Sequence, residues 1–228
     1  MIHRSKSYVS FLLILLFSVA AFPAFSQLQF VENKGQWNQL VKYKSDIQSG
    51  AVFLEKNGFT VLQYNEKDLK DFSEFMHGHV PENKNDIHAS NGNQLLRSHV
   101  YKVKMIGATE DVKSVPEKIL PTYNNYYLGN DKSKWQSGCK IYEAVTYKNV
   151  YPNIDVRYYT DAGTLKYDFI IYPGGNANDI LLQYEGAEKL YVKNRELIVQ
   201  TSVGEVKELY PYTYQVLENS REQLDCKY

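Results

Sequence analysis

The sequence predicts an all-β fold, an antiparallel β-sandwich or a larger supersandwich, with one long polar loop and room for one short helix. Three observations support this class. Residues 147–173 show the side-chain alternation of a tight hairpin, apolar runs flank Asn57-Gly58, and short strand patterns follow one another closely after Pro173. Strands of four to seven residues with little helix between them are typical of sandwiches and open barrels, not of βαβ units.

Residues 1–26 have the pattern of a secretory signal peptide. Two basic residues precede an apolar run, residues 9–22, which is short for a membrane span, and Ala24-Phe25-Ser26 has small residues at both cleavage positions. We therefore expect a secreted or cell-surface, β-rich domain of residues 27–228. No later segment is apolar for long enough to form a transmembrane helix.

Composition and charge narrow the classes of partner. Without Arg4 and Lys6, the 26 basic side chains fall to 24 against 26 acidic ones, a formal charge near −2. This charge gives no attraction to nucleic acid or to anionic lipid. A hydrophobic content of 43% is sufficient for a packed core. The 20 tyrosines suit half-buried sheet positions, and a carbohydrate-stacking surface is the alternative explanation.

The first elements after the signal peptide are a hairpin and a helix. Asn57-Gly58 predicts a type I′ turn between strands 51–56 and 59–64, because both central residues of that turn need positive φ. Apolar residues at near-helical spacing then predict a short amphipathic helix within residues 65–79; these are Leu69, Phe72, Phe75 and Met76.

The middle of the chain contains the longest break in the strand pattern. The polar tract 77–93 predicts a long loop, and the strand pattern returns at 99–106. Two prolines within residues 115–121 predict a connection rather than a strand. A further strand at 141–147 leads into the central hairpin.

The central hairpin joins strands 154–160 and 165–171 through a turn over residues 161–164. A loop centred on Ala162-Gly163 pairs residues whose numbers add to 325, and this register separates the side chains into two sets. The apolar face carries Ile154, Val156, Tyr158, Leu165, Tyr167, Phe169 and Ile171. The other face carries Asp155, Arg157, Tyr159, Lys166 and Asp168, with Ile170 as an exception.

After Pro173 the pattern predicts strands at 179–184, 189–192, 196–201, 205–209 and 212–217. Turns are expected at Lys193-Asn194 and Val203-Gly204. The final pattern, residues 223–228, stops within a strand, so we expect the sequence to be an N-terminal piece of a longer polypeptide.

The polar face of the central hairpin is a candidate site. The register places Arg157 opposite Asp168, with Asp155 diagonal to Asp168, at a separation that overlaps the carboxylate spacing of inverting glycosidases. A guanidinium between two carboxylates lowers their pKa values, whereas a general acid needs a raised one. The favoured interpretation is therefore a structural ion-pair cluster of Asp155, Arg157 and Asp168, and catalysis there is the minor alternative.

Other candidate sites are aromatic or contain cysteine. Exposed rings of Tyr123, Tyr126, Tyr127 and Trp135 would form stacking platforms for sugar rings. Cys139 and Cys226 could form a disulfide in an oxidising compartment, or could be two unrelated buried thiols.

Metal sites and catalytic motifs receive little support. His77 and His79, with His88 further on, lie in the predicted loop, where a solvated loop is favoured over a metal site. Asp131, Asp155 and Asp161 are possible calcium ligands without EF-hand spacing. The sequence contains no G-x-S-x-G, H-E-x-x-H, Walker or G-x-G-x-x-G motif, so no cofactor and no metal is predicted.

Several ordered motifs resemble one family across nearly all of residues 28–228: FVENKGQW, YNNYYLGND followed by a Trp, VYPNIDVRYY, LKYDFIIYPGG, ILLQYEGAEKL and YPYTYQ. They are similar to an uncharacterised N-terminal domain of large secreted proteins of the Bacteroidota. The resemblance implies downstream PKD-like or other β-repeat modules and a gliding-motility-type sorting domain for type IX secretion. It implies no activity for the domain itself.

These observations together lead us to expect a non-catalytic extracellular module with a structural or adhesion role at the N-terminus of a multidomain protein. Its expected partners are glycans or surface proteins and the downstream modules of the same polypeptide. The alternatives are a carbohydrate-binding module and, less favoured, a glycoside-active enzyme. The three hypotheses predict different structures. A structural module should bury the aromatic rings, and a carbohydrate-binding module should expose at least three coplanar rings. A glycoside-active enzyme should have a cleft that holds both carboxylates away from Arg157.

Overall fold

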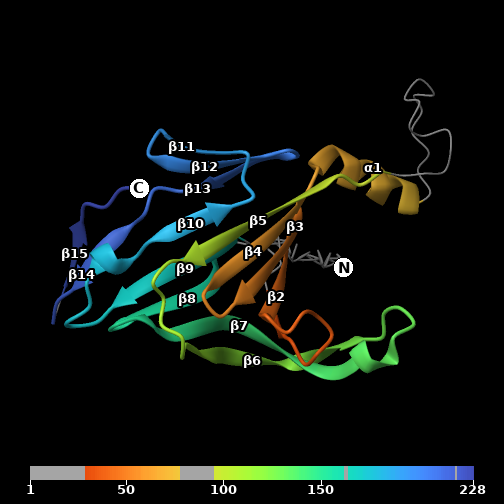
Figure 1. Cartoon of the computed structure of the whole chain (residues 1–228), viewed down its shortest axis with the longest axis horizontal. Coiled ribbons are helices and arrows are strands. Elements are labelled where there is room, and N and C mark those ends of the chain that lie inside the picture. Colours follow the sequence, from red (N-terminus) through yellow and green to blue (C-terminus); the bar gives the residue numbers. More distant parts are fainter. Residues whose placement is uncertain (1–28, 78–94, 162–163, 219) are drawn as a thin grey trace, which may run out of the picture.

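The computed structural model describes residues 29–77, 95–161, 164–218 and 220–228 (Figure 1). Within these ranges the chain is mostly β-strand, with one α-helix, α1 (Glu66–Met76), so the predicted all-β class is confirmed. No helix in the described part of the chain is both long and apolar enough to cross a membrane.

The main sheet is antiparallel throughout and has the order β10-β5-β4-β3-β2-β1-β7-β8-β9, with β6 also paired to β7. Its strands are β1 (Phe30–Glu32), β2 (Val41–Ile47), β3 (Gly50–Glu55), β4 (Gly58–Tyr64), β5 (Ser98–Met105), β6 (Lys113–Tyr126), β7 (Gln136–Tyr151), β8 (Ile154–Asp161), β9 (Thr164–Ile171) and β10 (Leu182–Glu185). A three-stranded sheet follows, with β11 (Lys189–Lys193), β12 (Glu196–Thr201) and β13 (Gly204–Glu208), and then the hairpin of β14 (Thr213–Val216) and β15 (Arg221–Leu224).

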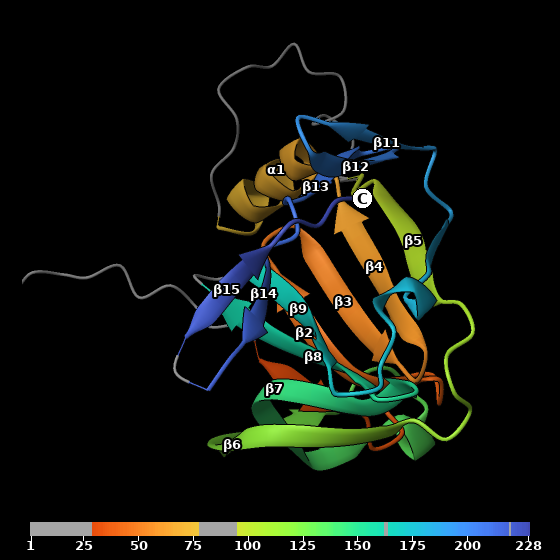
Figure 2. The same cartoon turned by 90° about the vertical axis from the view of Figure 1, so that its left-hand side faces the viewer.

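The main sheet bends at the long strand β7. Val145 is paired with Pro116 of β6 on one side and with Tyr158 of β8 on the other. Nearer the start of β7, Tyr142 is paired with β6 and with Phe30 of β1. β1 and β8 thus pair with successive parts of the same side of β7. The β1–β5 half and the β7–β9 half therefore separate at β7, and the sheet curls so that the two halves face each other (Figures 1 and 2).

The core lies between these two halves. The ring of Phe59 in β4 lies 5.9 Å from that of Tyr158 in β8 and 5.7 Å from that of Tyr167 in β9, between centroids. Val103 and Val145 in the same cluster are completely buried. One curled sheet thus provides both layers, which gives the fold its sandwich-like character.

The central hairpin has the predicted register. Its pairs run from Ile154↔Ile171 to Asp161↔Thr164, all with residue numbers that add to 325. Val156 and Tyr158 are buried on the apolar face, as the alternation predicts. The period of two in a pleated strand is enough to determine this register, because a slip of one residue would exchange the faces.

The β3–β4 hairpin is present, but its predicted turn is one residue out of position. Glu55 pairs with Gly58, so Lys56 and Asn57 form the turn, and Gly58 is the first residue of β4. A Cβ atom on Gly58 would lie 2.0 Å from the carbonyl oxygen of Val103 in β5. Glycine is required there by the close approach of the neighbouring strand, not by a type I′ turn.

Two turns of the small sheet are also displaced by one residue from the prediction. Asn194 and Arg195, both at positive φ, join β11 to β12, and Ser202 and Val203 join β12 to β13. The last strand is β15, which ends at Leu224 and pairs with β14, so the strand predicted at residues 223–228 is wrong in its position.

The stretch predicted as a proline-containing connection, residues 115–121, belongs to strand β6, and the prediction of a connection is wrong. Among the described strands, β6 pairs with β7 alone. Pro116 and Pro121 are tolerated because a strand at a sheet edge does not need every N–H for the ladder. The pairing shifts register between Ile119 and Tyr123, which accommodates the irregular backbone.

The predicted helix is confirmed as α1. The side chain of Asn65 caps it by accepting a hydrogen bond from the Asp68 N–H, and Arg97 at the start of the next described segment binds the Asp68 carboxylate at 2.7 Å. Of the loop predicted at residues 77–93, only His77 lies within the described residues.

The three-stranded sheet connects the two ends of the main sheet. Tyr167 of β9 and Tyr184 of β10 both donate hydrogen bonds to the carboxylate of Glu208 in β13, each at 2.7 Å. Since β9 and β10 are the terminal strands of the order, Glu208 links the two edges of the curled sheet. Val199 of β12 is completely buried in the main core.

Candidate functional site

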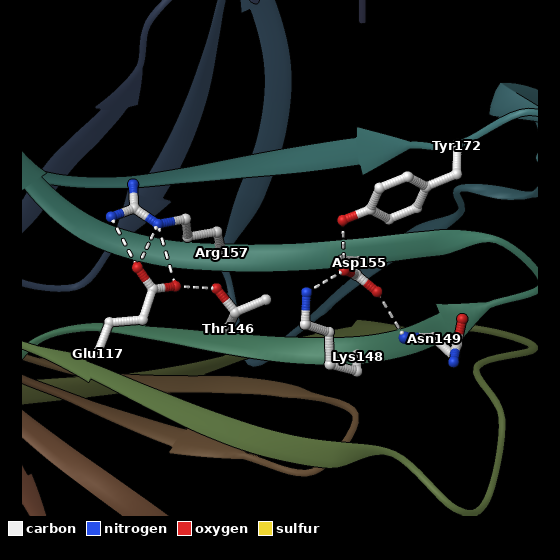
Figure 3. A network of polar contacts seen from close by, with 7 residues as sticks. All are labelled: Glu117, Thr146, Lys148, Asn149, Asp155, Arg157 and Tyr172. Carbon is white, nitrogen blue, oxygen red and sulfur yellow. Dashed lines mark hydrogen bonds and ion pairs between the residues drawn. The ribbon is translucent and has the colours of Figure 1, made fainter.

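A polar network crosses the outer face of β6, β7 and β8 (Figure 3). At its centre, Asp155 is only 2% exposed although it lies on the face predicted to be polar. Its carboxylate accepts hydrogen bonds from Lys148 Nζ at 2.7 Å, from the Asn149 N–H at 2.8 Å and from Tyr172 Oη at 3.0 Å. Buried carboxylates need this many donors, because desolvation without partners is costly.

The second part of the network joins β8 to β6 across β7. The Arg157 guanidinium contacts the Glu117 carboxylate at 3.2 to 3.3 Å, and Thr146 Oγ1, which lies between them on β7, donates to the same carboxylate (Figure 3). Arg157 also lies 4.9 Å above the ring of Tyr159, a cation–π distance.

The predicted ion-pair cluster of Asp155, Arg157 and Asp168 is therefore wrong in its partners. Arg157 is opposite Asp168 in the ladder, but its ion pair is with Glu117, and Asp155 pairs with Lys148. Asp168 accepts a hydrogen bond from Tyr159 Oη at 3.2 Å. The long arginine side chain reaches over β7 to a strand that the sequence did not place there.

The environment of Asp155 keeps it ionised. Burial raises the pKa of its carboxyl group, but the hydrogen bonds from Lys148, the Asn149 N–H and Tyr172, with the charge of Lys148, outweigh burial and leave the pKa below its ordinary value. A general acid needs the opposite shift. The geometry suits a carboxylate that fastens β8 to the last part of β7 and to Tyr172.

The four predicted stacking residues do not form one surface. Tyr123 and Tyr127 are 62% and 57% exposed, and Trp135 is half-buried. The rings of Tyr127 and Trp135 meet edge to face, with 71° between their planes. Tyr126 instead packs edge to face on Trp37, at 5.1 Å between centroids, over a small apolar cluster.

The two cysteines are free thiols in the structure, so the possible disulfide between Cys139 and Cys226 is not formed. Cys139 is completely buried in the same small cluster with Val31 and Ile141, against which Trp37 packs. Cys226 is half-buried and follows β15 in the C-terminal hairpin. The strand pairing of β7 directs Cys139 into an apolar environment, where it serves as a small hydrophobic residue.

We expect these thiols to differ in reactivity. Burial raises the pKa of the Cys139 thiol, so iodoacetamide should alkylate Cys226 alone in the native protein and both cysteines after unfolding without reductant. Intact mass spectrometry would show one adduct and then two. The Cys226→Ser variant is the control, with no adduct in the native state, and two unreactive cysteines in the unfolded wild type would contradict the prediction.

The candidate metal ligands are scattered. Across residues 29–77, 95–161, 164–218 and 220–228, no three His, Cys, Asp or Glu side chains are grouped closely enough to hold a metal ion. His77 is the C-cap residue of α1, and the Asp131 side chain caps a 3₁₀ turn at Lys132–Lys134. Asp161 ends β8, while His79 and His88 lie outside the described residues.

Sequence reasoning missed Glu117, Lys148, Tyr172 and Glu208, each of which binds a residue of a different strand. Lys148 and Asp155 were within reach, because they flank the turn between β7 and β8 on the same face. Glu117 and Glu208 could not be found from a local pattern. Glu117 is 40 residues from its partner Arg157, and Glu208 is 41 residues from its partner Tyr167.

Comparison with known proteins adds a family but no activity. No curated protein and no solved structure matches the chain. A family model described as "Domain of unknown function (DUF7948)" matches residues 30–228, from the start of β1 through the small sheet and the C-terminal hairpin. The chain therefore belongs to this family of domains of unknown function.

Proposed function

We propose that the chain is a non-catalytic extracellular module with a structural or adhesion role at the N-terminus of a larger secreted or cell-surface protein. The observation that carries the proposal is the buried Asp155, whose carboxylate is fully engaged by three donors from the sheet and its turns. The charged residues of the candidate site thus hold strands together. The signal-peptide pattern of residues 1–26 supports export, and the resemblance to Bacteroidota head domains supports the multidomain setting and type IX secretion.

An exposed apolar edge supplies the surface for adhesion. Ile119 and Tyr123 on β6 are 59% and 62% exposed, and Tyr127 and Leu128, just beyond the strand, are 57% and 76% exposed. Large apolar side chains gathered on one edge are typical of contact surfaces. We name these four residues the aromatic edge.

Carbohydrate binding is the second candidate, favoured by the exposure of Tyr123 and Tyr127 on this edge. Pyranose rings stack on such faces. The perpendicular arrangement of Tyr127 and Trp135 removes the flat platform of three coplanar rings that this hypothesis requires.

Adhesion should depend on the aromatic edge. Beads coated with the exported chain should retain cells of the organism that produces it, and Tyr123→Ser with Tyr127→Ser should reduce retention about tenfold or more, because aromatic anchors dominate contact energies. The matched control is Tyr212→Ser with Tyr214→Ser, two exposed tyrosines of the C-terminal segment, which should retain cells like the wild type.

The same assay separates the two candidates. Sensitivity of the cells to protease indicates a protein partner, whereas sensitivity to periodate, with binding on a glycan array, indicates carbohydrate. A folded wild-type chain that retains no cells and binds no glycan would overturn the adhesion role, and turnover of a glycoside substrate would overturn the non-catalytic role.

A further inference from the structure

A groove of about 490 Å³ lies at the end of the sheet formed by the start of β2, the β3–β4 turn and the end of β5. Four lysines and one glutamate line it, together with apolar Leu40, Met105, Ile106 and Ala108; the lysines are Lys42, Lys56, Lys102 and Lys104, and the glutamate is Glu55. We name it the lysine groove. Its volume is that of a ligand site, and no residue of the aromatic edge contributes to it.

Two of the four ammonium groups are available to a ligand. Lys102 pairs with Glu55 at 2.6 Å and Lys104 with Glu185 at 2.7 Å. Among the described residues, Lys42 donates a hydrogen bond only to the Gln39 carbonyl, and Lys56 forms no ion pair. The groove therefore offers an apolar floor, where Leu40 is 60% and Ile106 39% exposed, beside two uncompensated positive charges.

Helix α1 has the complementary surface. None of its residues is buried, and Phe72, Phe75 and Met76 are 38%, 48% and 65% exposed. At 100° per residue these three side chains and Leu69 form one stripe. Acidic residues Glu66 and Asp71 flank the stripe on its two sides, and the lysines of the helix, Lys67 and Lys70, lie on the opposite face. Asp68 lies within the stripe, but its charge is compensated by Arg97 of the same chain.

The helix cannot reach the groove of its own copy. The β3–β4 turn and α1 lie at opposite ends of β4, a strand of seven residues, about 20 Å long (Figures 1 and 2). Asp68 is bound to Arg97, which holds the first turn of α1 against the start of β5. Each copy thus presents both halves of a contact at two separate ends.

We propose that α1 of one copy binds in the lysine groove of a second copy. The apolar stripe lies on Leu40 and Ile106, and Glu66 and Asp71 face Lys42 and Lys56, in the manner of an amphipathic helix that docks in a groove. This contact is heterologous, so it extends head to tail and leaves one free helix and one free groove at the ends of each assembly. The partner in this contact is a second copy of the chain. Only the adhesive role of the resulting assembly rests on the proposed function.

Mixing two defective variants tests the contact. The groove variant carries Lys42→Glu and Lys56→Glu, and the helix variant carries Phe72→Gln and Phe75→Gln, with glutamine chosen because it keeps helix propensity. Sedimentation equilibrium of the wild type should show a mass that rises beyond the dimer up to about 1 mM, the range expected for a small contact. Each variant alone should remain a monomer, and an equimolar mixture should double in mass and go no further.

The charge control is Lys193→Glu with Lys207→Glu on the three-stranded sheet, which should associate like the wild type. A wild type that stays monomeric, or a mixture that stays monomeric, would overturn the contact. Cell retention at the aromatic edge is measured separately with surface-bound chains, so failure of self-association does not count against the adhesion role.

Discussion

Replacing Glu208 with alanine is expected to lower the free energy of unfolding by about 3 kcal/mol, measured by urea denaturation. The substitution removes the acceptor for Tyr167 and Tyr184, and hydrogen bonds to a charged group contribute about 1.5–3 kcal/mol each but are not additive. The pKa of both phenols is raised, mainly by burial, so both tyrosines stay protonated near neutral pH and keep a hydroxyl donor that needs an acceptor. The loss should be large because the carboxylate connects the two terminal strands of the main sheet.

Two controls test whether the effect comes from the hydrogen bonds of Tyr167 and Tyr184 to Glu208. Glu205 lies on the same strand and accepts one solvent-exposed hydrogen bond from half-buried Tyr191, so Glu205→Ala should cost less than about 1 kcal/mol. In a background with Tyr167→Phe and Tyr184→Phe, Glu208→Ala should cost much less than in the wild type. An equal cost in both backgrounds would show that the two tyrosine contacts do not stabilise the fold.

Replacing Asp155 with alanine should also cost about 3 kcal/mol at neutral pH, because it leaves the Asn149 N–H and Tyr172 Oη without their acceptor and Lys148 without its counter-ion. Lys148 is 43% exposed and can regain water, which keeps the loss below that of a fully buried pair. Asp168→Ala is the matched control on the same face and should cost less than about 1 kcal/mol. A larger effect at Asp168 than at Asp155 would restore the ion-pair cluster predicted from the sequence.

The pH dependence gives an independent check on Asp155. Its folded-state pKa lies below the unfolded value of 3.8, so the folded state binds the proton less readily than the unfolded chain does. The stabilisation is therefore fully present above about pH 5 and is lost as pH falls through the folded pKa. The difference in unfolding free energy between wild type and Asp155→Ala should shrink in acid, and a difference that persists unchanged to about pH 2 would contradict the assignment.

The outer face of the β7–β8–β9 sheet shows where sequence reasoning stops. The alternation of side chains correctly placed Asp155, Arg157 and Asp168 on one face, because a pleated strand has a period of two. Their partners could not be predicted in the same way. Arg157 lies opposite Asp168 of β9 on one side and Thr146 of β7 on the other, but its ion pair is with Glu117 one strand beyond, on β6. The prolines had assigned that segment to a connection.

The turns show a smaller error of the same kind. Asn57-Gly58 was interpreted as the centre of a type I′ turn, whereas Gly58 begins β4 and lies so close to the carbonyl of Val103 that a Cβ atom would collide with it. That neighbour belongs to β5, 45 residues further along the chain. A glycine signal in a sequence does not distinguish a positive φ in a turn from the close approach of another strand.

Local patterns in the sequence were enough to predict the all-β class, the register of the central hairpin, the presence of α1 and which residues of β8 and β9 share a face. These features depend on patterns of period 2 or 3.6 within a short segment. The folded chain was needed to find the partners of Arg157 and Asp155, the burial of Cys139, the angle between the rings of Tyr127 and Trp135, and the link from Glu208 to both edges of the sheet. Each of these depends on which distant strands lie side by side, and that order is set by the packing of the whole core, which no local pattern contains.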